Sequence, residues 1–551
     1  MKRQLFYVNW LILNLFQAAT TGLLDDEAYY WVYSRFPDWG YFDHPPMVAL
    51  LIKAGYTIFA NPLGVRLFIV LMCTATLWMI DLLIGKRNDK LFFSIALSMF
   101  LLQIGGILAV PDLPLIFFVA LFFVVYKQLI KRQNFLFGLL LGIVSALMCY
   151  SKYHGLLVIF FTLLSNPRLF LKWTTWLAAV TAGLLLLPHL MWQINHGNPS
   201  LNYHLFERNA LQYQAEFTIE YIYGQILLAG PLIGWMLWWG VFKYKPEDEI
   251  EKALKWNVIG ITLLFLLASF KGRTEANWTV PVFVGLIVLG HRYINTNQKL
   301  EKWVYKLMIP AVVLILVLRI YMMSDIKPLS WFPKDEFHKT REWANAIHDS
   351  AKGLPVVFVN SYQKASQYWF YTGDTSFSLN TLQYRRNNYN FWPLEERLQG
   401  KKVMVVKSDR SEIFPNAIAN ERKMVHYFLA NPYFSFTSLQ LSNDKTQEIS
   451  ADKKTWKTTL ELKTIPQTKI NSFAPGSDTA HIYVALFAHD DDVAYLLRTE
   501  TTVNQLIKQN KVPLTIDISS LKKQSYRYKW GIGSSVPGMP SMNSVSYKLG
   551  L

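Results

Sequence analysis

The chain contains very little cysteine. Only Cys73 and Cys149 occur among its 551 residues, and both lie inside apolar runs. A disulfide framework or a cysteine-bound metal ion requires several cysteines at characteristic spacings. The sequence therefore excludes both as the basis of this fold, and we expect no cysteine metal site.

Charged residues are also scarce, and the scarcity is uneven along the chain. They make up 17% of the residues, whereas hydrophobic residues make up 52%. A soluble protein carries about a quarter charged residues. Apolar runs are concentrated before residue 323, and several reach the roughly 17–25 residues that cross a bilayer as a helix. We therefore expect a multi-pass α-helical membrane protein.

About eleven segments have the length and hydropathy expected of spans. The first is expected to be a retained helix, because no small-residue cleavage site follows it. The eleven segments lie near residues 5–23, 63–84, 91–108, 113–130, 135–150, 153–166, 173–193, 219–241, 254–270, 277–290 and 304–323.

Lysine and arginine are distributed unevenly over the connecting loops. Alternate loops carry basic clusters, at 86–90, 127–132, 243–255 and 292–306. The positive-inside rule makes these loops cytoplasmic, together with the N-terminus. An odd number of spans then places the residues after 323 on the extracytoplasmic side. The tail has no eukaryotic-looking feature, so we expect a bacterial inner-membrane protein with a periplasmic C-terminal region.

The net charge of +17 also reflects the basic loops that set membrane orientation. It arises from 55 basic and 38 acidic residues, and much of the excess lies in short loops that set membrane orientation. We therefore expect membrane lipids, and no nucleic acid, around this protein.

Unusual polar residues gather in the loops of the predicted outer face. The first of these loops, Leu23–Met47, carries Asp26, Glu27, Asp43 and His44 among many aromatic residues. A plain connector between two membrane helices needs none of these residues. We therefore interpret it as an active-site loop whose aromatic rings suit the membrane interface.

Two short helices are expected in this loop. The segment from Glu27 to Arg35 follows Asp25 and Asp26, either of which fits as an N-cap. A second helix is expected to begin near Pro45, because proline fits a first turn. Both helices are predicted to lie in the plane of the membrane surface.

The other outer loops add further polar residues. Asp112 lies in a Val-Pro-Asp-Leu-Pro segment, and a long loop over 195–218 contains Glu207, Arg208 and Asn209. The remaining outer-loop candidates are Lys152 and Tyr153, and then Lys271, Arg273, Glu275 and Asn277.

The composition changes after about residue 323. A helix is expected over Glu336–Ser350, and buried strands over Leu354–Asn360 and Lys402–Lys407. From residue 452 the pattern alternates like β-strands with Gly, Pro and Asp between them. We predict three domains: a transmembrane domain over 1–323, an α/β domain over 324–451 and a β-sandwich-like domain over 452–551.

Several of these motifs together resemble a known family. Asp26-Glu27, then Tyr41–Met47, then Pro111–Pro114, and finally Lys271–Trp278 are similar to motifs of GT-C fold glycosyltransferases. The family members concerned are the protein O-mannosyltransferases and the lipid A aminoarabinose transferases. The segment from Tyr362 to Asn387 also resembles the soluble tails of bacterial members.

The resemblance implies transfer of a sugar from a polyprenyl-phosphate carrier to a lipid, glycan or protein acceptor on the outer face. Asp26 matches the catalytic acidic residue of the first outer loop, and Asp112 matches a second acidic residue near the acceptor. The sequence departs from the aminoarabinose transferases at His44, where they have a lysine matched to the donor phosphate.

These residues suit the chemistry of such a transfer. A carboxylate serves as general base for the acceptor hydroxyl, and a single displacement inverts the anomeric carbon. Asp26 is the predicted base, with Asp112 and Glu27 as further catalytic candidates. Cations stabilise the departing phosphate; the candidates are Arg273, Lys271, Lys152 and His44. The candidates for substrate binding are Asp43, Tyr153, Glu275 and Asn277.

Simpler interpretations remain beside these. Asp43 and Asp112 fit as helix caps, and Lys271 and Arg273 fit as cations that reach from span ends to the interface. No metal site is predicted, although a divalent cation stays open as a cofactor. A transporter or lipid flippase with an outer domain is the main alternative function, and a non-catalytic receptor or scaffold is the second.

Overall fold

The computed structural model describes residues 3–203, 213–325, 337–409, 411–420, 424–443, 448–452, 454–463, 476, 478–488, 493–522 and 524–550. Glu207, Arg208 and Asn209 of the long outer loop lie outside these residues. The chain divides into two compact units, Met1–His338 and Lys339–Leu551. We call them the helical unit and the sheet unit. The three-domain division with boundaries at 323 and 451 stays a prediction.

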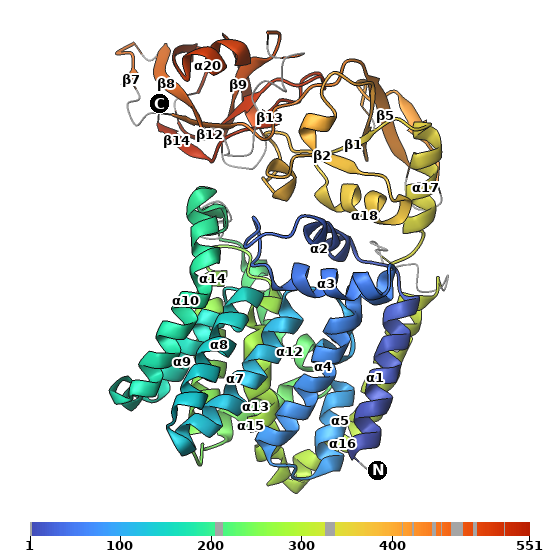
Figure 1. Ribbon diagram of the computed structural model, residues 1–551, viewed down its shortest axis with the longest axis vertical. Helices are drawn as coiled ribbons and strands as arrows, with labels where there is room; N and C mark the ends of the chain where they lie inside the picture. The colour runs from blue at the N-terminus through green and yellow to red at the C-terminus, as the bar shows by residue number, and fades with distance from the viewer. Residues whose placement is uncertain are drawn as a thin grey trace. The chain divides into compact units, whose positions relative to one another are not determined.

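The helical unit is a bundle whose long helices run roughly alongside one another (Figure 1). The short helices α2 and α3 lie across one end of the bundle, and the N-terminus lies at the other end. Its helices are α1 (Arg3–Thr20), α2 (Asp25–Arg35), α3 (Met47–Ile58), α4 (Pro62–Ile84), α5 (Asp89–Ser98), α6 (Phe100–Gln103), η1 (Gly105–Ile107), α7 (Asp112–Arg132), α8 (Phe135–Ser151), α9 (Gly155–Ser165), η2 (Pro167–Leu171), α10 (Trp173–Asn195), α11 (Pro199–Asn202), α12 (Ala215–Ala229), α13 (Gly234–Lys243), α14 (Glu249–Ser269), η4 (Ala276–Val282), α15 (Phe283–Asn295) and α16 (Gln298–Met323).

Local sequence signals fix many of the helix ends. Asn61 caps α4 by accepting the Gly64 backbone N–H at 3.3 Å, and Gly85 ends that helix with a positive φ of 81°. Asp248 caps α14 by accepting the Glu251 N–H at 2.8 Å. Such side-chain caps replace hydrogen bonds that the first turn of a helix lacks.

Several helices have the length and apolar composition needed to cross a membrane. The predicted number of eleven spans is not established. Among the described residues, four helices are each long and apolar enough to cross a membrane: α4, α7, α10 and α16. Two bent pairs of helices raise the number of candidate spans to six. The helices α3, α8 and α9 are apolar but shorter.

Two segments expected as single spans are bent in the structure. The helices over 89–107 bend by 73°, and α12 and α13 bend by 97°. The two breaks meet, because a Cβ atom on Gly230 would lie 2.6 Å from the Ser98 carbonyl oxygen. Gly230 also has a φ of 122°, which favours glycine. Gly230 and Pro231 mark the second break in the sequence, whereas Ser98-Met99-Phe100 at the first break contains neither glycine nor proline.

The first half of the sheet unit is an α/β layer. Its sheet has the order β2-β1-β3-β5-β4, in which β1 pairs in parallel with β2 and with β3. The two strands predicted from apolar runs are β1 and β3, and the expected helix is α17. The elements are α17 (Thr340–Ala351), β1 (Val356–Val359), α18 (Tyr362–Thr372), β2 (Ser376–Leu379), β3 (Val403–Lys407), β4 (Asn416–Ile418) and β5 (Val425–Ala430).

The second half consists of two antiparallel sheets around one core. One sheet contains β10-β9-β12-β13 with β14, and the other contains β11-β8-β6 with β7. The rings of Trp456 and Trp530, one from each sheet, lie 5.7 Å apart in this core. The strands are β6 (Gln440–Asn443), β7 (Glu448–Ile449), β8 (Thr455–Lys463), β9 (His481–Phe487), β10 (Val493–Thr502), β11 (Lys511–Asp517), β12 (Ser525–Ile532), β13 (Ser541–Met542) and β14 (Tyr547–Gly550), and helix α20 (Val503–Gln509) follows β10.

Candidate active site

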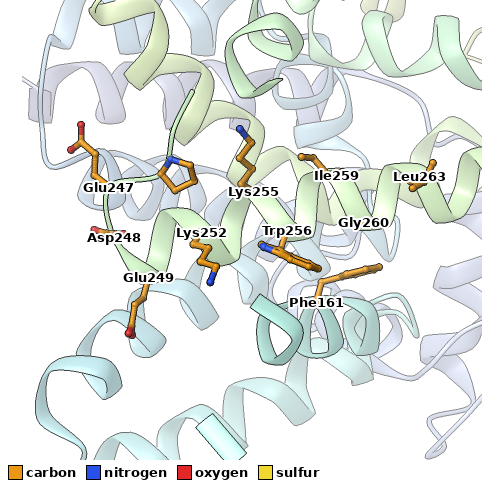
Figure 2. Close-up of a pocket in the computed structure, with 11 residues that line it drawn as sticks. Phe161, Glu247, Asp248, Glu249, Lys252, Lys255, Trp256, Ile259, Gly260 and Leu263 are labelled. Carbon is orange, nitrogen blue, oxygen red and sulfur yellow. The ribbon is translucent and has the colours of Figure 1, made fainter. Parts of the chain in front are cut away.

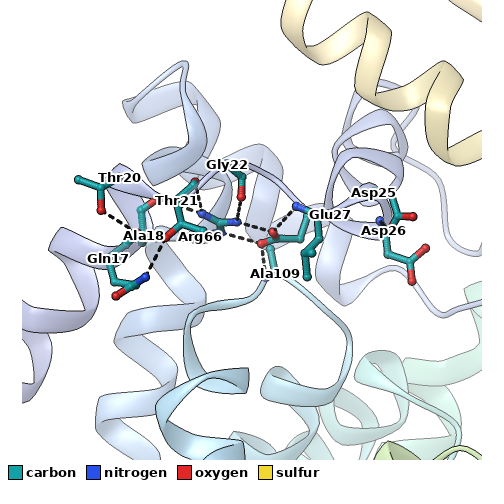
Figure 3. Close-up of polar contacts among 11 residues, drawn as sticks. Gln17, Ala18, Thr20, Thr21, Gly22, Asp25, Asp26, Glu27, Arg66 and Ala109 are labelled. Carbon is teal, nitrogen blue, oxygen red and sulfur yellow. Dashed lines mark hydrogen bonds and ion pairs between the residues drawn. The ribbon is translucent and has the colours of Figure 1, made fainter. Parts of the chain in front are cut away.

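A completely buried ion pair lies at the start of Leu23–Met47, the first loop of the predicted outer face. Glu27 of α2 and Arg66 of α4 are both 0% exposed, and the Arg66 Nε lies 2.7 Å from the Glu27 Oε1 (Figure 3). One Arg66 Nη2 N–H donates to the Glu27 Oε2, and the other guanidinium N–H groups donate to the carbonyls of Ala18, Thr21 and Gly22 at the end of α1. A buried charge requires such partners, so Arg66 fixes the loop against the bundle.

Glu27 also contacts the segment that precedes Asp112. Its carboxylate also accepts the backbone N–H of Leu24 at 3.0 Å and that of Ala109 at 2.8 Å. Ala109 lies three residues before Asp112, so one carboxylate joins the two acidic motifs. Both oxygens of Glu27 are therefore occupied by protein donors, and its predicted catalytic role stays a prediction.

Asp25 and Asp26 occupy the first turn of α2. The expected N-cap role is wrong for both, because α2 begins at Asp25 and the cap residue is Leu24. The Leu24 N–H is taken by Glu27 instead. Figure 3 shows the side chains of Asp25 and Asp26 directed away from Arg66. Asp26 is half-buried, and its negative charge suits the N-terminus of a helix.

Three predicted site residues from different outer loops meet around Asp112. The Lys152 Nζ lies 2.7 Å from the Asp112 Oδ1, and the Asn277 Nδ2 donates to the Oδ2 at 3.2 Å. Asp112 begins α7, Lys152 follows α8, and Asn277 lies in η4. The Asp112 and Lys152 side chains are 7% and 6% exposed. Asp112 therefore does more than occupy a helix terminus: it joins three loops.

Asp43 is held by tyrosines of α2. The hydroxyls of Tyr29 and Tyr33 each donate to the Asp43 Oδ2 at 3.3 Å. Burial raises the pKa of Tyr33 well above its usual value, so its phenol remains a proton donor. Next to Asp43, the His44 ring packs edge-on against Tyr30 at 5.6 Å. The alternative role of Asp43 as a cap of the second helix is wrong, because α3 begins at Met47 and its cap residue is Pro46.

Side chains of helix α10 form hydrogen bonds with the loop Leu23–Met47. The Trp192 Nε1 donates to the Asp38 Oδ2 at 2.8 Å, and the His189 Nδ1 lies 2.7 Å from the Trp39 carbonyl oxygen. The other ring nitrogen of His189 lies 3.2 Å from the hydroxyl of Tyr153. Neither Trp192 nor His189 is among the predicted site residues. No local pattern reveals these partners.

Tyr153 belongs to the same network. Its hydroxyl accepts the Gln193 Nε2 at 3.0 Å, and Gln193 also donates to Ser200 at 2.9 Å. Ser200 donates in turn to the carbonyls of Tyr41 and Phe42. Burial raises the pKa of Tyr153 above its usual value. The His189 Nδ1 faces a carbonyl and must donate to it, so the Nε2 of the neutral ring accepts the single proton of the Tyr153 hydroxyl.

The predicted phosphate-binding cations form separate contacts. Arg273 is 61% exposed and pairs with Glu220 at 3.3 Å and Glu275 at 3.8 Å. Lys271 is exposed, and Lys152 pairs with Asp112. The structure thus brings Lys152 to the predicted residue Asp112 in a buried pair, and Arg273 to the predicted residue Glu275 in an exposed one.

A cavity of about 880 Å³ lies along α14 (Figure 2). Figure 2 shows Glu247, Asp248 and Glu249 at one end and Leu263 at the other. The cavity follows the first half of α14, whereas Asn277 lies beyond the opposite end of that helix. It is therefore not part of the Asp112 cluster. Within the described part of the chain, no group of three His, Cys, Asp or Glu side chains is placed to hold a metal ion.

Known proteins resemble this chain in sequence. A family model described as dolichyl-phosphate-mannose-protein mannosyltransferase matches residues 43–192. The lipid A galacturonosyltransferase RgtD of Rhizobium johnstonii is 25% identical over 300 residues, which cover 51% of this chain and 62% of that protein. An uncharacterized protein of Aquifex aeolicus is 25% identical over 277 residues, which cover 47% and 54%. The match spans less than two thirds of either relative.

Solved structures resemble it in fold. ArnT from Cupriavidus metallidurans in the apo state has a TM-score of 0.56 at 12% identity, over 77% of this chain and 97% of that chain. The same protein bound to undecaprenyl phosphate has a TM-score of 0.55. The chain therefore has the GT-C fold and resembles the mannosyltransferase and lipid A glycosyltransferase group, as the outer-loop motifs predicted.

Proposed function

We propose that this protein is an inverting glycosyltransferase that moves a monosaccharide from a polyprenyl-phosphate carrier to an acceptor on the extracytoplasmic face of the membrane. The observation that carries the proposal is the convergence of the outer-loop motifs. Glu27 joins the Asp26 loop to Ala109, and Asp112 joins the next motifs through Lys152 and Asn277. Packing alone does not require polar residues from four loops at one end of an apolar bundle.

Asp26 is the proposed general base. Its carboxylate takes the proton of the acceptor hydroxyl while the hydroxyl oxygen attacks the anomeric carbon. The bond between that carbon and the phosphate oxygen breaks, and polyprenyl phosphate leaves with the electron pair. A single displacement from the opposite face inverts the anomeric configuration. Asp26 suits this role because it is half-buried, on a helix that the Glu27–Arg66 pair holds in place.

The other site residues have supporting roles in this scheme. Asp112 orients the acceptor side of the site, and Lys152 stabilises the departing phosphate as a point charge. Lys152 is preferred because the Asp112 cluster holds it in place, while Arg273, Lys271 and His44 remain candidates. Asp43, Tyr153, Glu275 and Asn277 are proposed substrate contacts.

The similar proteins suggest which substrates to test. The curated relative acts on lipid A and transfers galacturonic acid, and one ArnT structure holds undecaprenyl phosphate. These names support a lipid-linked donor and make a lipid A-type glycolipid the first acceptor to try, ahead of a glycan or protein. They also make a uronic acid the first sugar to try.

The bent helix pairs favour one rival function, a transporter or lipid flippase, because transporters build substrate sites at helix breaks. The breaks here contain no ionisable side chain within Ser98–Phe100 or Gly230–Ile233, and they pack against each other. Transporter sites usually place ionisable groups at such points. This absence favours the transferase.

The test is a transfer assay with the purified full-length protein. Synthetic polyprenyl-phosphate donors that carry radiolabelled galacturonic acid, aminoarabinose or mannose are incubated with membrane extract. The wild-type protein is expected to label an acceptor. Asp26→Asn keeps the side-chain size and removes the base, so transfer should fall by about a hundredfold or more.

The neighbouring substitution Asp25→Asn is the matched comparison and should reduce transfer far less. Equal activity of wild type and Asp26→Asn would move the base to Asp112 or Glu27. If no donor supports transfer and the protein moves lipid in proteoliposomes, the transporter reading replaces this proposal.

A further inference from the structure

The cavity along α14 has a charged end and an apolar end. Glu247, Glu249 and Lys252 line the charged end, and we call these three side chains the charged cluster. Figure 2 shows Lys252 between Glu249 and Trp256 along the helix. The volume of about 880 Å³ lies within the range of roughly 300–1,000 Å³ that is usual for ligand pockets. The apolar lining consists of Phe161, Ile259, Gly260 and Leu263.

The charged end of the cavity lies at the same end of the bundle as the N-terminus. Arg292 pairs with Glu251 of α14 at 2.9 Å and donates to the Leu83 carbonyl near the end of α4 at 3.5 Å. Asp81, two residues earlier in α4, pairs with Arg3 at 3.0 Å. The helices α2 and α3 lie across the other end (Figure 1). The cavity is therefore remote from the proposed transfer site, and its charged end lies among loops predicted to be cytoplasmic.

The apolar part of the cavity has the depth of one membrane leaflet. Lys252 and Leu263 are eleven positions apart on α14, which corresponds to about 16 Å at 1.5 Å per residue. Half of a hydrocarbon core that is about 30 Å thick is about 15 Å. Between them, Trp256 is 43% exposed, as suits an aromatic residue at the membrane interface. An acyl chain that begins beside Lys252 would reach the middle of the bilayer beside Leu263.

The helix α9 supplies an apolar wall of this cavity. A Cβ atom on Gly260 would lie 2.2 Å from the Phe161 ring, so that ring packs directly against the backbone of α14. Both residues line the cavity. The close contact fixes the two helices to each other, and it leaves an apolar surface against which a hydrocarbon chain can pack.

The charged cluster is available to a ligand. Within the part of the chain that the structure describes, no ion pair joins its three side chains to other residues. The two other charged lining residues have partners. Asp248 accepts the Glu251 N–H at 2.8 Å, and the Lys255 Nζ donates to the Tyr244 carbonyl at 2.5 Å. Two carboxylates and one ammonium therefore remain, and they suit a headgroup that carries both signs of charge better than a wholly anionic one.

The order of these groups along α14 matches the order of groups in a phospholipid that carries an amine. Glu247 and Glu249 come first, Lys252 follows, and the apolar lining comes last. In phosphatidylethanolamine the ammonium is outermost, the phosphate follows after two carbons, and the acyl chains come last. Carboxylates form charge-assisted hydrogen bonds with an ammonium group, and lysine binds phosphate as a point charge.

We propose that this cavity binds one molecule of phosphatidylethanolamine. The carboxylates of Glu247 and Glu249 bind its ammonium, Lys252 binds its phosphate, and an acyl chain lies along Trp256 and Leu263. The site does not depend on the transfer reaction, because it lies at the other end of the bundle from α2. It gives the helical unit a lipid-binding site that is separate from the proposed donor and acceptor sites.

The test measures equilibrium lipid binding to the delipidated full-length protein in detergent by native mass spectrometry. Three probes with identical acyl chains are compared: phosphatidylethanolamine, phosphatidylglycerol, which lacks the ammonium, and phosphatidylcholine, whose ammonium has no N–H group. Phosphatidylethanolamine should bind about tenfold more tightly than either of the others, the lower range for hydrogen bonds to charged groups.

Substitutions in the charged cluster separate the two headgroup charges. Glu247→Gln with Glu249→Gln should weaken phosphatidylethanolamine binding about tenfold and abolish its preference over phosphatidylglycerol. Lys252→Gln should weaken binding of both lipids. Glu247→Asp with Glu249→Asp keeps both carboxylates and should retain most of the preference. The matched control is Lys299→Gln with Lys302→Gln, which removes two exposed lysines of α16 that do not line the cavity and should leave binding unchanged.

The apolar part is tested separately. Ile259→Trp fills the cavity and keeps the charged cluster, so it should weaken binding of phosphatidylethanolamine. Equal binding of the three lipids by the wild-type protein, or a preference for phosphatidylglycerol, overturns the proposal. So does unchanged binding by glutamine variants of the charged cluster whose thermal unfolding matches that of the wild type. Asp26→Asn should lose transfer and keep this binding, so failure of the two proposals can be told apart.

Discussion

Arg66 illustrates what one charge inside an apolar bundle requires. Its guanidinium contacts one carboxylate and three backbone carbonyls, and no part of the side chain reaches solvent. A charge without such partners would cost several kcal/mol in a low-dielectric interior. The need for partners brings the end of α1 and the start of α2 to the same point of α4.

Removing either member of this pair should destabilise the helical unit. Glu27→Ala and Arg66→Ala are each expected to lower the free energy of unfolding by about 3–5 kcal/mol, because each leaves a buried charge without its partner. The double variant should lose less than the sum of the two single variants. Thermal unfolding in detergent measures this coupling, and strictly additive losses would contradict it.

The Asp112–Lys152 pair allows stability and activity to be separated. Asp112→Asn should lower the free energy of unfolding by about 3 kcal/mol, because Lys152 remains buried without its carboxylate. Adding Lys152→Met removes the stranded charge and should restore most of that stability. Transfer should stay low in both variants, because the first lacks the proposed acceptor contact Asp112 and the second also lacks the Lys152 charge proposed for the phosphate. Recovery of transfer in the double variant would assign both Asp112 and Lys152 purely structural roles.

At the scale of elements, α10 determines where the first outer loop lies. It contributes Trp192, His189 and Gln193 to contacts with that loop and with Tyr153. Gly40 permits this close packing, because a Cβ atom there would lie 2.5 Å from the Trp192 ring. The position of the loop therefore depends on its packing against α10.

Gly40→Ala should disturb this packing and reduce transfer. Overpacking of this kind costs about 1–3 kcal/mol, and the displaced loop should misplace Asp26. Gly183→Ala is the matched control on α10, because nothing lies within 4 Å of its Cβ position. It should leave transfer unchanged and stabilise the helix by up to about 1 kcal/mol. Similar thermal stability and transfer for both variants would argue against the positioning role of α10.

At the scale of the whole molecule, the proposal requires a particular orientation in the membrane. The basic loops are expected on the cytoplasmic side, and the acidic loops and the sheet unit on the other side. The native Cys73 and Cys149 are 1% and 6% exposed, so introduced cysteines can be labelled against a low background.

Cysteine labelling should reveal this orientation. Gln214→Cys and Lys401→Cys are expected to react with an impermeant maleimide from the periplasmic side, whereas Lys299→Cys should react only after the membrane is opened. All three positions are exposed. Labelling of Lys299→Cys in intact cells, or protection of Lys401→Cys there, would contradict the predicted topology.

The sequence by itself determined the general organisation of the protein. Apolar runs indicated a helical bundle, and alternating patterns after it indicated the sheets, because both signals depend on neighbouring residues. The resemblance of the loop motifs to those of known glycosyltransferases predicted Asp26 and Asp112 as site residues, and it predicted the GT-C fold. Residues close in sequence carry these signals, so no tertiary information was needed.

Only the tertiary structure decided which residues meet. Arg66 pairs with a residue 39 positions away, and Asn277 contacts Asp112 across 165 positions. The break at Ser98–Phe100, the contacts of α10 with the loop and the role of Leu24 as the cap of α2 were not predicted either. These features depend on how helices pack, and packing is set by long-range contacts that hydropathy and residue spacing do not encode.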